Sequence, residues 1–268
     1  MPPDELIPRR KDELSPSKAS SNAITSRMAE DLLSIKKTEL LDDAMVHFKC
    51  ENLEKALREK LDIHDRPIMR SDLKNIEWLQ LIIHDLSLLK PPDQISDLSP
   101  LREMTRLQEL ALSGIQIPDF SPLQGMTQLK TLWLTQNQIS DFSPIQGMTQ
   151  MRNLHLSENQ ISDLSFLKGM AQLTTLWLDQ NQISDLFPLQ GMTQMRYLDL
   201  SYNKISDLSP IQGMTQLKGL GLSENQISDL SPLQGMTKLE KLSLKENQIS
   251  GSEIAKLKEA LPDCDITF

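Results

Sequence analysis

The chain has 268 residues, of which 24% are charged and 38% are hydrophobic, and its formal net charge at pH 7 is −9. This length and composition indicate one mid-sized domain or one elongated repeat domain, and they exclude a collagen-like or wholly disordered chain. The acidic charge argues against nucleic acid or an anionic membrane as a partner. The two cysteines, Cys50 and Cys264, lie too far apart for a disulfide framework or a paired-cysteine zinc site.

The N-terminal segment is polar. Residues 1–27 are rich in Ser, Pro and charged residues and lack the apolar core of a signal peptide, so we predict a disordered N-terminus there. The longest apolar stretch elsewhere, around residues 78–89, is interrupted by polar residues and is far too short to cross a bilayer. We therefore expect a cytoplasmic protein, with secretion that does not use a classical signal peptide as the alternative.

Residues 28–75 are predicted to form a helical cap at the N-terminal end. Apolar residues recur there at helical spacing in two groups. The first group is Leu33, Leu40, Ala44, Met45 and Phe48, and the second is Leu53, Ala56, Leu57 and Leu61. A cap of this kind covers the apolar end of a repeat array, which would otherwise be exposed to water.

Residues 76–250 are dominated by an internal repeat with a period of 22 residues. Six clear copies begin at Leu123, and residues 101–122 form a looser copy. The apolar positions follow the pattern L-x-x-L-x-L-x-x-N-x-I, and the L-x-L part alternates as expected for a short strand with one buried face. A unit this short cannot bury that face alone, so neighbouring copies must stack with their strands in parallel.

We therefore predict an α/β solenoid: a curved rod with a parallel sheet on the concave side, short turns or 3₁₀ segments on the convex side, and a helical cap at each end. Residues 251–268 supply the C-terminal cap, because Ser250 and Glu253 have the spacing of a capping box. Leu257 lies on the apolar face of the helix that follows, and Ile266 is expected to pack under it.

Three residue types recur once in each repeat. The amides of an Asn column are expected to satisfy backbone groups of adjoining turns: Asn137, Asn159, Asn181, Asn203, Asn225 and Asn247. An Asp column is expected to cap short turns, with a calcium ladder as the alternative: Asp97, Asp119, Asp141, Asp163, Asp185, Asp207 and Asp229. A Met column is expected to belong to the core, with a soft-metal site or an adaptable binding surface as the alternatives: Met104, Met126, Met148, Met170, Met192, Met214 and Met236.

These motifs resemble the leucine-rich repeat family, specifically the 22-residue class found in bacterial internalin-like proteins and in the phosphatase-binding sds22-type proteins. The resemblance covers about residues 76–249, and residues 52–81 are similar to the helical N-terminal cap of the bacterial internalin-like proteins. It implies a solenoid that binds other proteins. The first repeat departs from the pattern, because Ile115 stands where Asn is expected and extra residues separate Leu81 from Leu112.

No catalytic or cofactor-binding motif is found in the sequence. There is no phosphate-binding loop, no G-x-S-x-G and no H-E-x-x-H. The His64-Asp65 and His84-Asp85 pairs are poor candidates for a base and its orienting acid, because adjacent residues on one element seldom point together. We predict that the protein is not an enzyme and that it binds no metal and no cofactor.

The strand positions beside the buried leucines are expected to face solvent on the concave side. They differ between repeats, whereas the convex glutamines scarcely change, and all three Trp and both Tyr residues map to them. Such differences indicate a binding surface, with chance variation after a recent duplication as the alternative. Trp and Tyr beside carboxylates are typical of protein-binding hot spots. The predicted partner-binding residues are Trp133, His155, Glu158, Trp177, Asp179, Tyr197, Asp199 and Tyr202.

The expected function is a protein-protein interaction scaffold that binds a protein or peptide with a basic and apolar contact surface. One alternative is a regulator or inhibitor of a partner enzyme, as the resemblance to sds22-type and ribonuclease-inhibitor-type repeats implies. A secreted effector or adhesin of the internalin type and a structural spacer are the others. Neither nucleic acid nor a membrane is expected as a partner.

Overall fold

A computed structural model describes residues 43–81, 95–115 and 119–268. The chain divides into two units, Met1–Ala44 and Met45–Phe268, and almost all described residues belong to the second. Residues 1–27, for which we predict disorder, lie outside the described residues. So does the first part of the predicted N-terminal cap, with Leu33 and Leu40.

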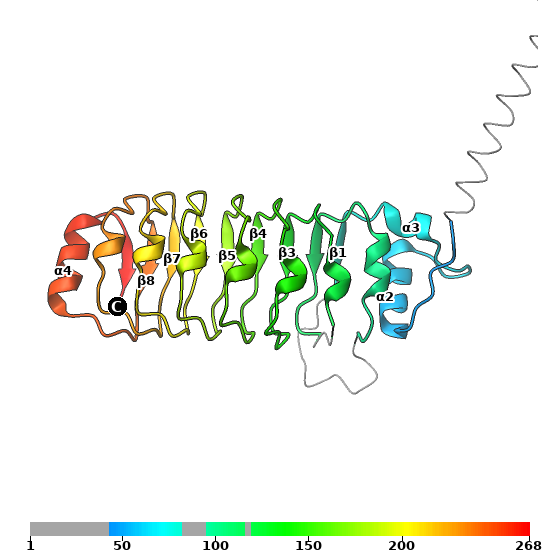
Figure 1. Ribbon diagram of the computed structural model, residues 1–268, viewed down its shortest axis with the longest axis horizontal. Helices are drawn as coiled ribbons and strands as arrows, with labels where there is room; N and C mark the ends of the chain where they lie inside the picture. Colours follow the sequence, from blue (N-terminus) through cyan, green and yellow to red (C-terminus); the bar gives the residue numbers. More distant parts are fainter. Residues whose placement is uncertain (1–42, 82–94, 116–118) are drawn as a thin grey trace, which may run out of the picture. The chain divides into compact units, whose positions relative to one another are not determined.

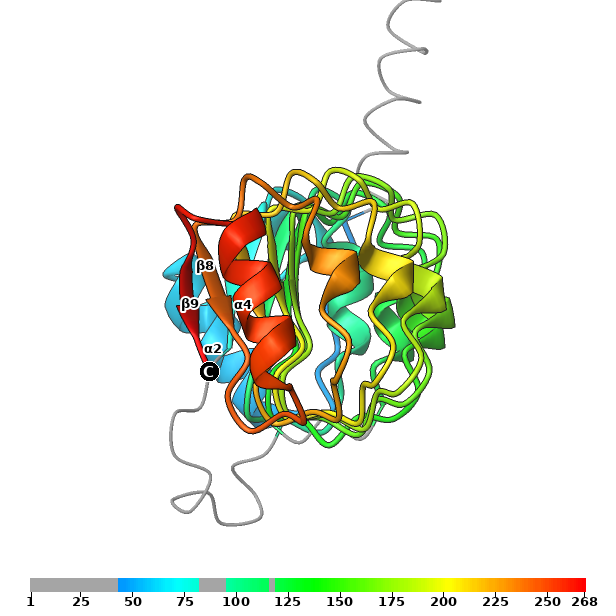
Figure 2. The same cartoon turned by 90° about the vertical axis from the view of Figure 1, so that its left-hand side faces the viewer.

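The L-x-L segments form one parallel sheet within the unit Met45–Phe268 (Figures 1 and 2). In the described part of the chain the sheet has nine strands, and they pair in chain order. The strands are β1 (Trp78–Gln80), β2 (Glu109–Ala111), β3 (Thr131–Trp133), β4 (Asn153–His155), β5 (Thr175–Trp177), β6 (Tyr197–Asp199), β7 (Gly219–Gly221), β8 (Lys241–Ser243) and β9 (Asp265–Thr267). The central leucine of each strand from β1 to β8 is buried, so these leucines form a continuous ladder inside the solenoid.

Short 3₁₀ helices lie on the side of the solenoid opposite the sheet (Figure 2). They are η2 (Ser99–Glu103), η3 (Ser121–Leu123), η4 (Ser143–Ile145), η5 (Ser165–Leu167), η6 (Phe187–Leu189), η7 (Ser209–Ile211) and η8 (Ser231–Leu233). Each begins two residues after an Asp of the Asp column. At Asp163 the carboxylate accepts hydrogen bonds from the backbone N–H of Ser165 (2.8 Å) and from its hydroxyl (2.6 Å). The parallel sheet and the 3₁₀ turns confirm the predicted solenoid, and the Asp column caps the turns.

The Asn column ties neighbouring repeats together. The side-chain amide of Asn181 donates hydrogen bonds to the carbonyl oxygens of Leu156 and Leu178, both at 3.0 Å, and its Oδ1 accepts one from the N–H of Ile161 at 3.0 Å. The same contacts recur at Asn159, Asn203, Asn225 and Asn247. The column therefore satisfies buried backbone groups, as predicted.

Methionine and phenylalanine side chains contribute to the buried core. Six members of the Met column are buried and Met126 is partly buried against the same core, so their assignment to the core is confirmed. The rings of Phe120, Phe142 and Phe166 form a further column, with successive centroids 5.5 and 5.1 Å apart.

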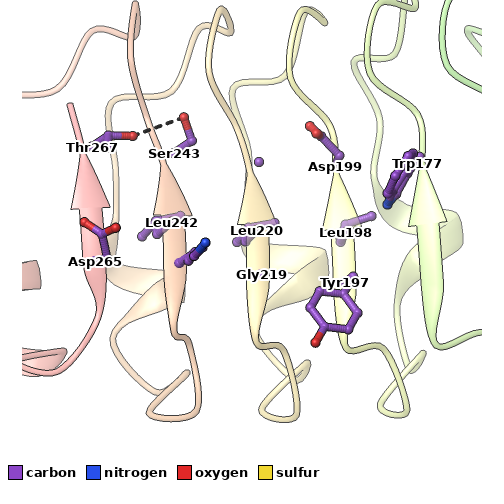
Figure 3. Close-up of a pocket in the computed structure, with 12 residues that line it drawn as sticks. Trp177, Tyr197, Leu198, Asp199, Gly219, Leu220, Leu242, Ser243, Asp265 and Thr267 are labelled. Atoms are coloured by element: carbon purple, nitrogen blue, oxygen red, sulfur yellow. Dashed lines mark hydrogen bonds between the residues drawn. The ribbon is translucent and has the colours of Figure 1, made fainter.

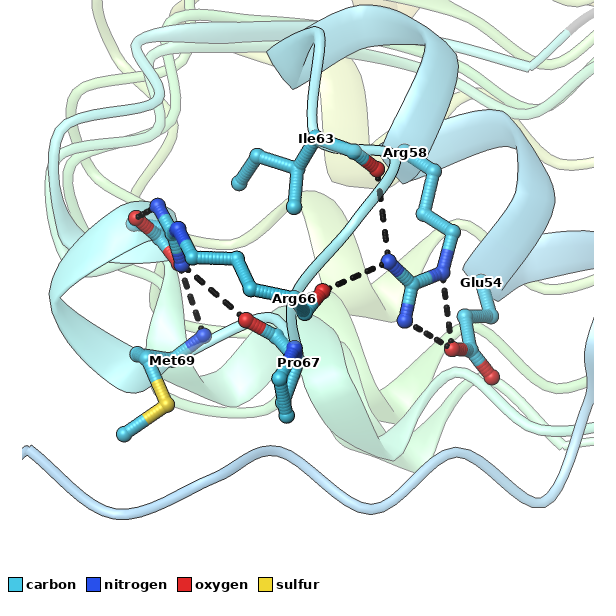
Figure 4. Close-up of polar contacts among 7 residues, drawn as sticks. Glu54, Arg58, Ile63, Arg66, Pro67 and Met69 are labelled. Carbon is cyan, nitrogen blue, oxygen red and sulfur yellow. Dashed lines mark hydrogen bonds and ion pairs between the residues drawn. The ribbon is translucent and has the colours of Figure 1, made fainter.

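In the part of the chain that the structure describes, two helices precede the first strand: α2 (Glu51–Leu61) and α3 (Arg70–Lys74). Leu53 and Leu57 of α2 are fully buried. The guanidinium of Arg58 pairs with Glu54 and also donates to the carbonyl oxygens of Ile63 and Arg66, which fixes the loop after α2 (Figure 4). These contacts hold the helix against the loop that leads to α3.

The prediction that Met45 and Phe48 lie on a helix is wrong. Residues 43–50 contain no helix, and Met45 instead forms an antiparallel bridge with Met69. The N–H of Val46 donates to the carbonyl oxygen of Ile68 at 2.9 Å. The segment around Met45 is therefore extended, and it pairs through its backbone with Ile68 and Met69 instead of forming the hydrogen bonds of a helix. The spacing of the apolar residues alone could not distinguish a helix from this extended pairing.

The last repeat is covered by α4 (Gly251–Ala260), followed by β9. The Ser250 side chain accepts a hydrogen bond from the N–H of Glu253 at 3.3 Å, as the capping-box spacing indicates, and Leu257 is fully buried. Ile266 packs against the core, but as the centre of β9, a strand that the sequence analysis did not predict. The predicted domain boundaries at residues 28, 76 and 251 stay predictions.

Candidate functional site

The outward side of the sheet, here called the strand face, consists of the first and third residue of each strand. The parallel register places equivalent residues of successive repeats side by side. One row follows the first strand positions: Trp78, Glu109, Thr131, Asn153, Thr175, Tyr197, Gly219, Lys241 and Asp265. The second row follows the third positions: Gln80, Ala111, Trp133, His155, Trp177, Asp199, Gly221, Ser243 and Thr267.

Large aromatic side chains on the strand face differ in exposure. Trp177 is 45% exposed and Tyr197 is 46% exposed, so both are available to a partner. Trp133 is only partly exposed, and His155 is 8% exposed. The expectation that His155 faces solvent is therefore wrong.

His155 is buried because it lies between two indole rings on the adjacent strands. Its ring centroid is 5.3 Å from that of Trp133 and 4.3 Å from that of Trp177, the second contact being edge-on. Strands of a sheet lie about 4.8 Å apart, so rings on adjacent strands can cover one another. Burial lowers the pKa of His155 from 6.5 to about 4, and the imidazole is neutral at pH 7.

Carboxylates lie beside this stack of rings. Burial raises the pKa of Asp179, and the nearby charges of Asp199 and Glu158 raise it further, against a hydrogen bond from the Ser157 hydroxyl that lowers it. Glu158 accepts a hydrogen bond from the Gln136 side chain at 2.6 Å. The structure thus places the charges of Asp199 and Glu158 close enough to act on Asp179.

Tyr202 lies in the turn after β6 and is 54% exposed. Its φ of 57° is left-handed, which is unusual for a bulky residue. Equivalent residues of other repeats share this conformation, for example Gln180 at 57° and Glu224 at 55°. The strain is therefore a property of the repeat and not a mark of a special role for Tyr202.

A hollow of about 340 Å³ opens on the strand face where β7 presents two glycines, Gly219 and Gly221 (Figure 3). Its sides are formed by residues from β5, β6, β8 and β9, among them Trp177, Tyr197, Asp199, Lys241, Asp265 and Thr267. Sequence reasoning identified the β5 and β6 residues but missed those of β8 and β9. The signal in the sequence that could have located the hollow is the pair Gly219 and Gly221, which leaves both outward positions of one strand without a side chain.

In the described part of the chain, no group of three or more His, Cys, Asp or Glu side chains is arranged to hold a metal ion. Among these same residues, no helix combines the length and the apolar character needed to cross a membrane.

The fold and the strand face define a leucine-rich repeat solenoid, a class that generally serves as protein-interaction scaffolds and is typically non-enzymatic. The family model for leucine-rich repeats (two copies) matches residues 127–169, 171–213 and 215–259. Internalin C2 of Listeria monocytogenes str. 4b F2365 is similar, with a TM-score of 0.73 and 30% identity over 82% of this chain and 94% of that one. The chain therefore belongs to the leucine-rich repeat proteins of the internalin type.

Two further comparisons agree on the fold. Internalin F of the same Listeria strain has a TM-score of 0.66 and 28% identity over 82% of this chain and 71% of that one. A leucine-rich repeat protein of Leptospira interrogans has a TM-score of 0.51 and 24% identity over 65% of this chain and 52% of that one, which supports the fold alone. No curated protein sequence matches the chain.

Proposed function

We propose that the protein is a binding scaffold that holds a protein or peptide on its strand face. The observation that supports this proposal best is the placement of exposed Trp177 and Tyr197 next to Asp179 and Asp199 on a hydrogen-bonded sheet. Aromatic anchors on a rigid surface lose little conformational entropy on binding, so they are efficient hot spots.

The partner is expected to present a basic and apolar surface. The repulsion that Asp199 and Glu158 exert on Asp179 is relieved when a cation approaches, whereas a phosphate backbone would increase it. Binding in the cytoplasm and the absence of enzymatic activity stay predictions.

The test is capture of partners from a lysate of the source cell by the native chain and by a Trp177→Ser, Tyr197→Ser double variant with native circular dichroism. Each anchor is expected to contribute roughly 2 kcal/mol to binding, so the double variant should lose its partner. Trp133 is left unchanged, because its ring covers His155.

Phe187→Ser is the matched control, because Phe187 is a 67% exposed aromatic on η6, away from the strand face. It should retain the partner. Identical capture by the native chain and the double variant would refute the strand face as the binding surface.

A further inference from the structure

Strand β7 leaves a gap in the side-chain cover of the strand face. Among the described strands it is the one with glycine at both outward positions, Gly219 and Gly221. The hollow of about 340 Å³ lies over it, and the backbone around buried Leu220 forms its floor (Figure 3).

The two glycines also allow neighbouring side chains to lean over β7. A Cβ atom added at Gly221 would clash with Oδ1 of Asp199 and would lie 2.9 Å from Oγ of Ser201. A Cβ atom added at Gly219 would lie 3.1 Å from the ring of Tyr197. The carboxylate of Asp199 and the ring of Tyr197 therefore occupy the edge of the hollow because β7 has no side chains there.

Oxygen atoms dominate one row of the hollow. Asp199, Ser243 and Thr267 occupy third strand positions, with Gly221 between Asp199 and Ser243. The Thr267 hydroxyl donates to Oγ of Ser243 at 3.2 Å. Asp199 uses Oδ1 to accept a hydrogen bond from the N–H of Ser201 at 3.0 Å. Oγ of Ser243 also shares a hydrogen bond with Oγ of Ser223 at 2.5 Å. When Ser243 donates in that bond, one of its lone pairs remains for a donor-rich guest, alongside the carboxylate of Asp199.

The charges around the hollow are unbalanced. Of the residues that line it, Asp199 and Asp265 are acidic and Lys241 is basic, which leaves one net negative charge. Lys241 belongs to the first row, opposite Gly219, and not to the oxygen row. A cation above Gly221 would therefore lie between Asp199 and the two hydroxyl groups, with Lys241 on the neighbouring row.

We propose that this hollow takes an arginine side chain of the partner protein. The planar guanidinium has five N–H donors, enough to reach the carboxylate of Asp199 and the hydroxyl of Ser243 together, and its face can lie against the ring of Tyr197. The aliphatic stem would cover the glycine backbone of β7. This inference rests on the proposed function and names the residue that anchors the partner.

The test uses N-acetyl-arginine amide as the probe, added to the ¹⁵N-labelled full chain and followed by NMR. The amides of Gly219 and Gly221 should shift, with a dissociation constant on the order of 1 to 10 mM, as expected for a fragment of this size. N-acetyl-citrulline amide, a neutral probe of nearly the same shape, should bind about fivefold more weakly or worse.

Variants then assign the binding to the hollow. Asp199→Asn keeps the shape and removes the charge, and Gly221→Ala displaces the carboxylate, so each should weaken the arginine probe about fivefold. Gly235→Ala is the control, because a Cβ atom added at Gly235 meets no atom within 4 Å. Equal binding of the arginine and citrulline probes, equal binding of N-acetyl-lysine amide, or an undiminished affinity for the arginine probe in Gly221→Ala would overturn the proposal.

The inference and the proposed function can fail separately. If the Trp177→Ser, Tyr197→Ser variant loses its partner while the arginine probe fails to shift Gly219 and Gly221, the strand face stands and the arginine site is refuted. If the probe binds but partner capture is unchanged, the hollow is a cation site and the proposal that the partner binds on the strand face is refuted.

Discussion

The position of His155 shows how the size of neighbouring side chains changes the character of a single residue. Its place on the sheet is outward, like that of Asp199 two strands away. The difference is that Trp133 and Trp177 flank it, so that its imidazole is buried and its pKa is lowered to about 4. Because the charged imidazole is disfavoured in the folded state, protonation must favour unfolding.

We therefore expect the stability of the native chain to fall as the pH drops. The unfolded His155 takes up its proton near pH 6.5 and the folded one near pH 4. Above pH 6.5 His155 is neutral in both states and does not reduce the free energy of unfolding. Between pH 6.5 and about pH 4 only the unfolded state takes up the proton, so the free energy of unfolding falls by up to about 3 kcal/mol. Urea unfolding at a series of pH values from 7 to 4 measures this loss of stability. His155→Phe is the control, because it keeps an aromatic ring at this position but has no group that titrates. Equal pH slopes for the two proteins would contradict the burial of the imidazole.

The Asn column adds hydrogen bonds between repeats to the packing of the leucines. Each buried Asn bonds to carbonyl groups of its own turn and of the preceding repeat, and it accepts from an N–H group of that repeat. Inside the solenoid no water can satisfy these backbone groups, so the amide supplies their hydrogen bonds in the repeats that carry the Asn.

Asn181→Ala should therefore lower the free energy of unfolding by about 3 kcal/mol or more, because it leaves several buried backbone groups without partners. Asn247→Ala is the matched control: it removes the same set of contacts, but Asn247 is only half-buried in the last repeat, where water can replace the amide. Its expected cost is about 1 kcal/mol. Urea unfolding measures both. Equal losses would contradict the expected effect of burial, and a loss below about 1 kcal/mol for Asn181→Ala would show that the contacts are unimportant.

Most of the fold could be predicted from the sequence because its contacts recur at a fixed period. The strand register, the Asn contacts and the turn caps follow from residues that reappear every 22 positions. What could not be predicted lacks that repetition: the extended segment at Met45, the strand β9 and the burial of His155. Each depends on which element lies alongside, and Gly221 likewise becomes informative only once Asp199 is known to lean over it.

The unit Met45–Phe268 is nearly one-dimensional, since each described strand pairs only with the strands before and after it in the chain. In such a molecule a perturbation acts first on adjacent repeats and reaches distant ones only through cooperative unfolding. The two ends are therefore expected to open more readily than the middle, where the predicted partner-binding residues lie. The candidate site is therefore expected to lie on the part of the sheet that opens least readily.

A comparison of Leu257→Ala in α4 with Leu176→Ala in β5 tests this view, because both leucines are fully buried. Each change should cost about 2 to 5 kcal/mol locally. We expect Leu176→Ala to speed native-state hydrogen exchange throughout the sheet, whereas Leu257→Ala should speed it mainly in β8 and β9, which lie next to α4 (Figure 2). Uniform acceleration by Leu257→Ala would instead mean that the solenoid unfolds as one unit, and that its C-terminal end is as essential to the strand face as β5 itself.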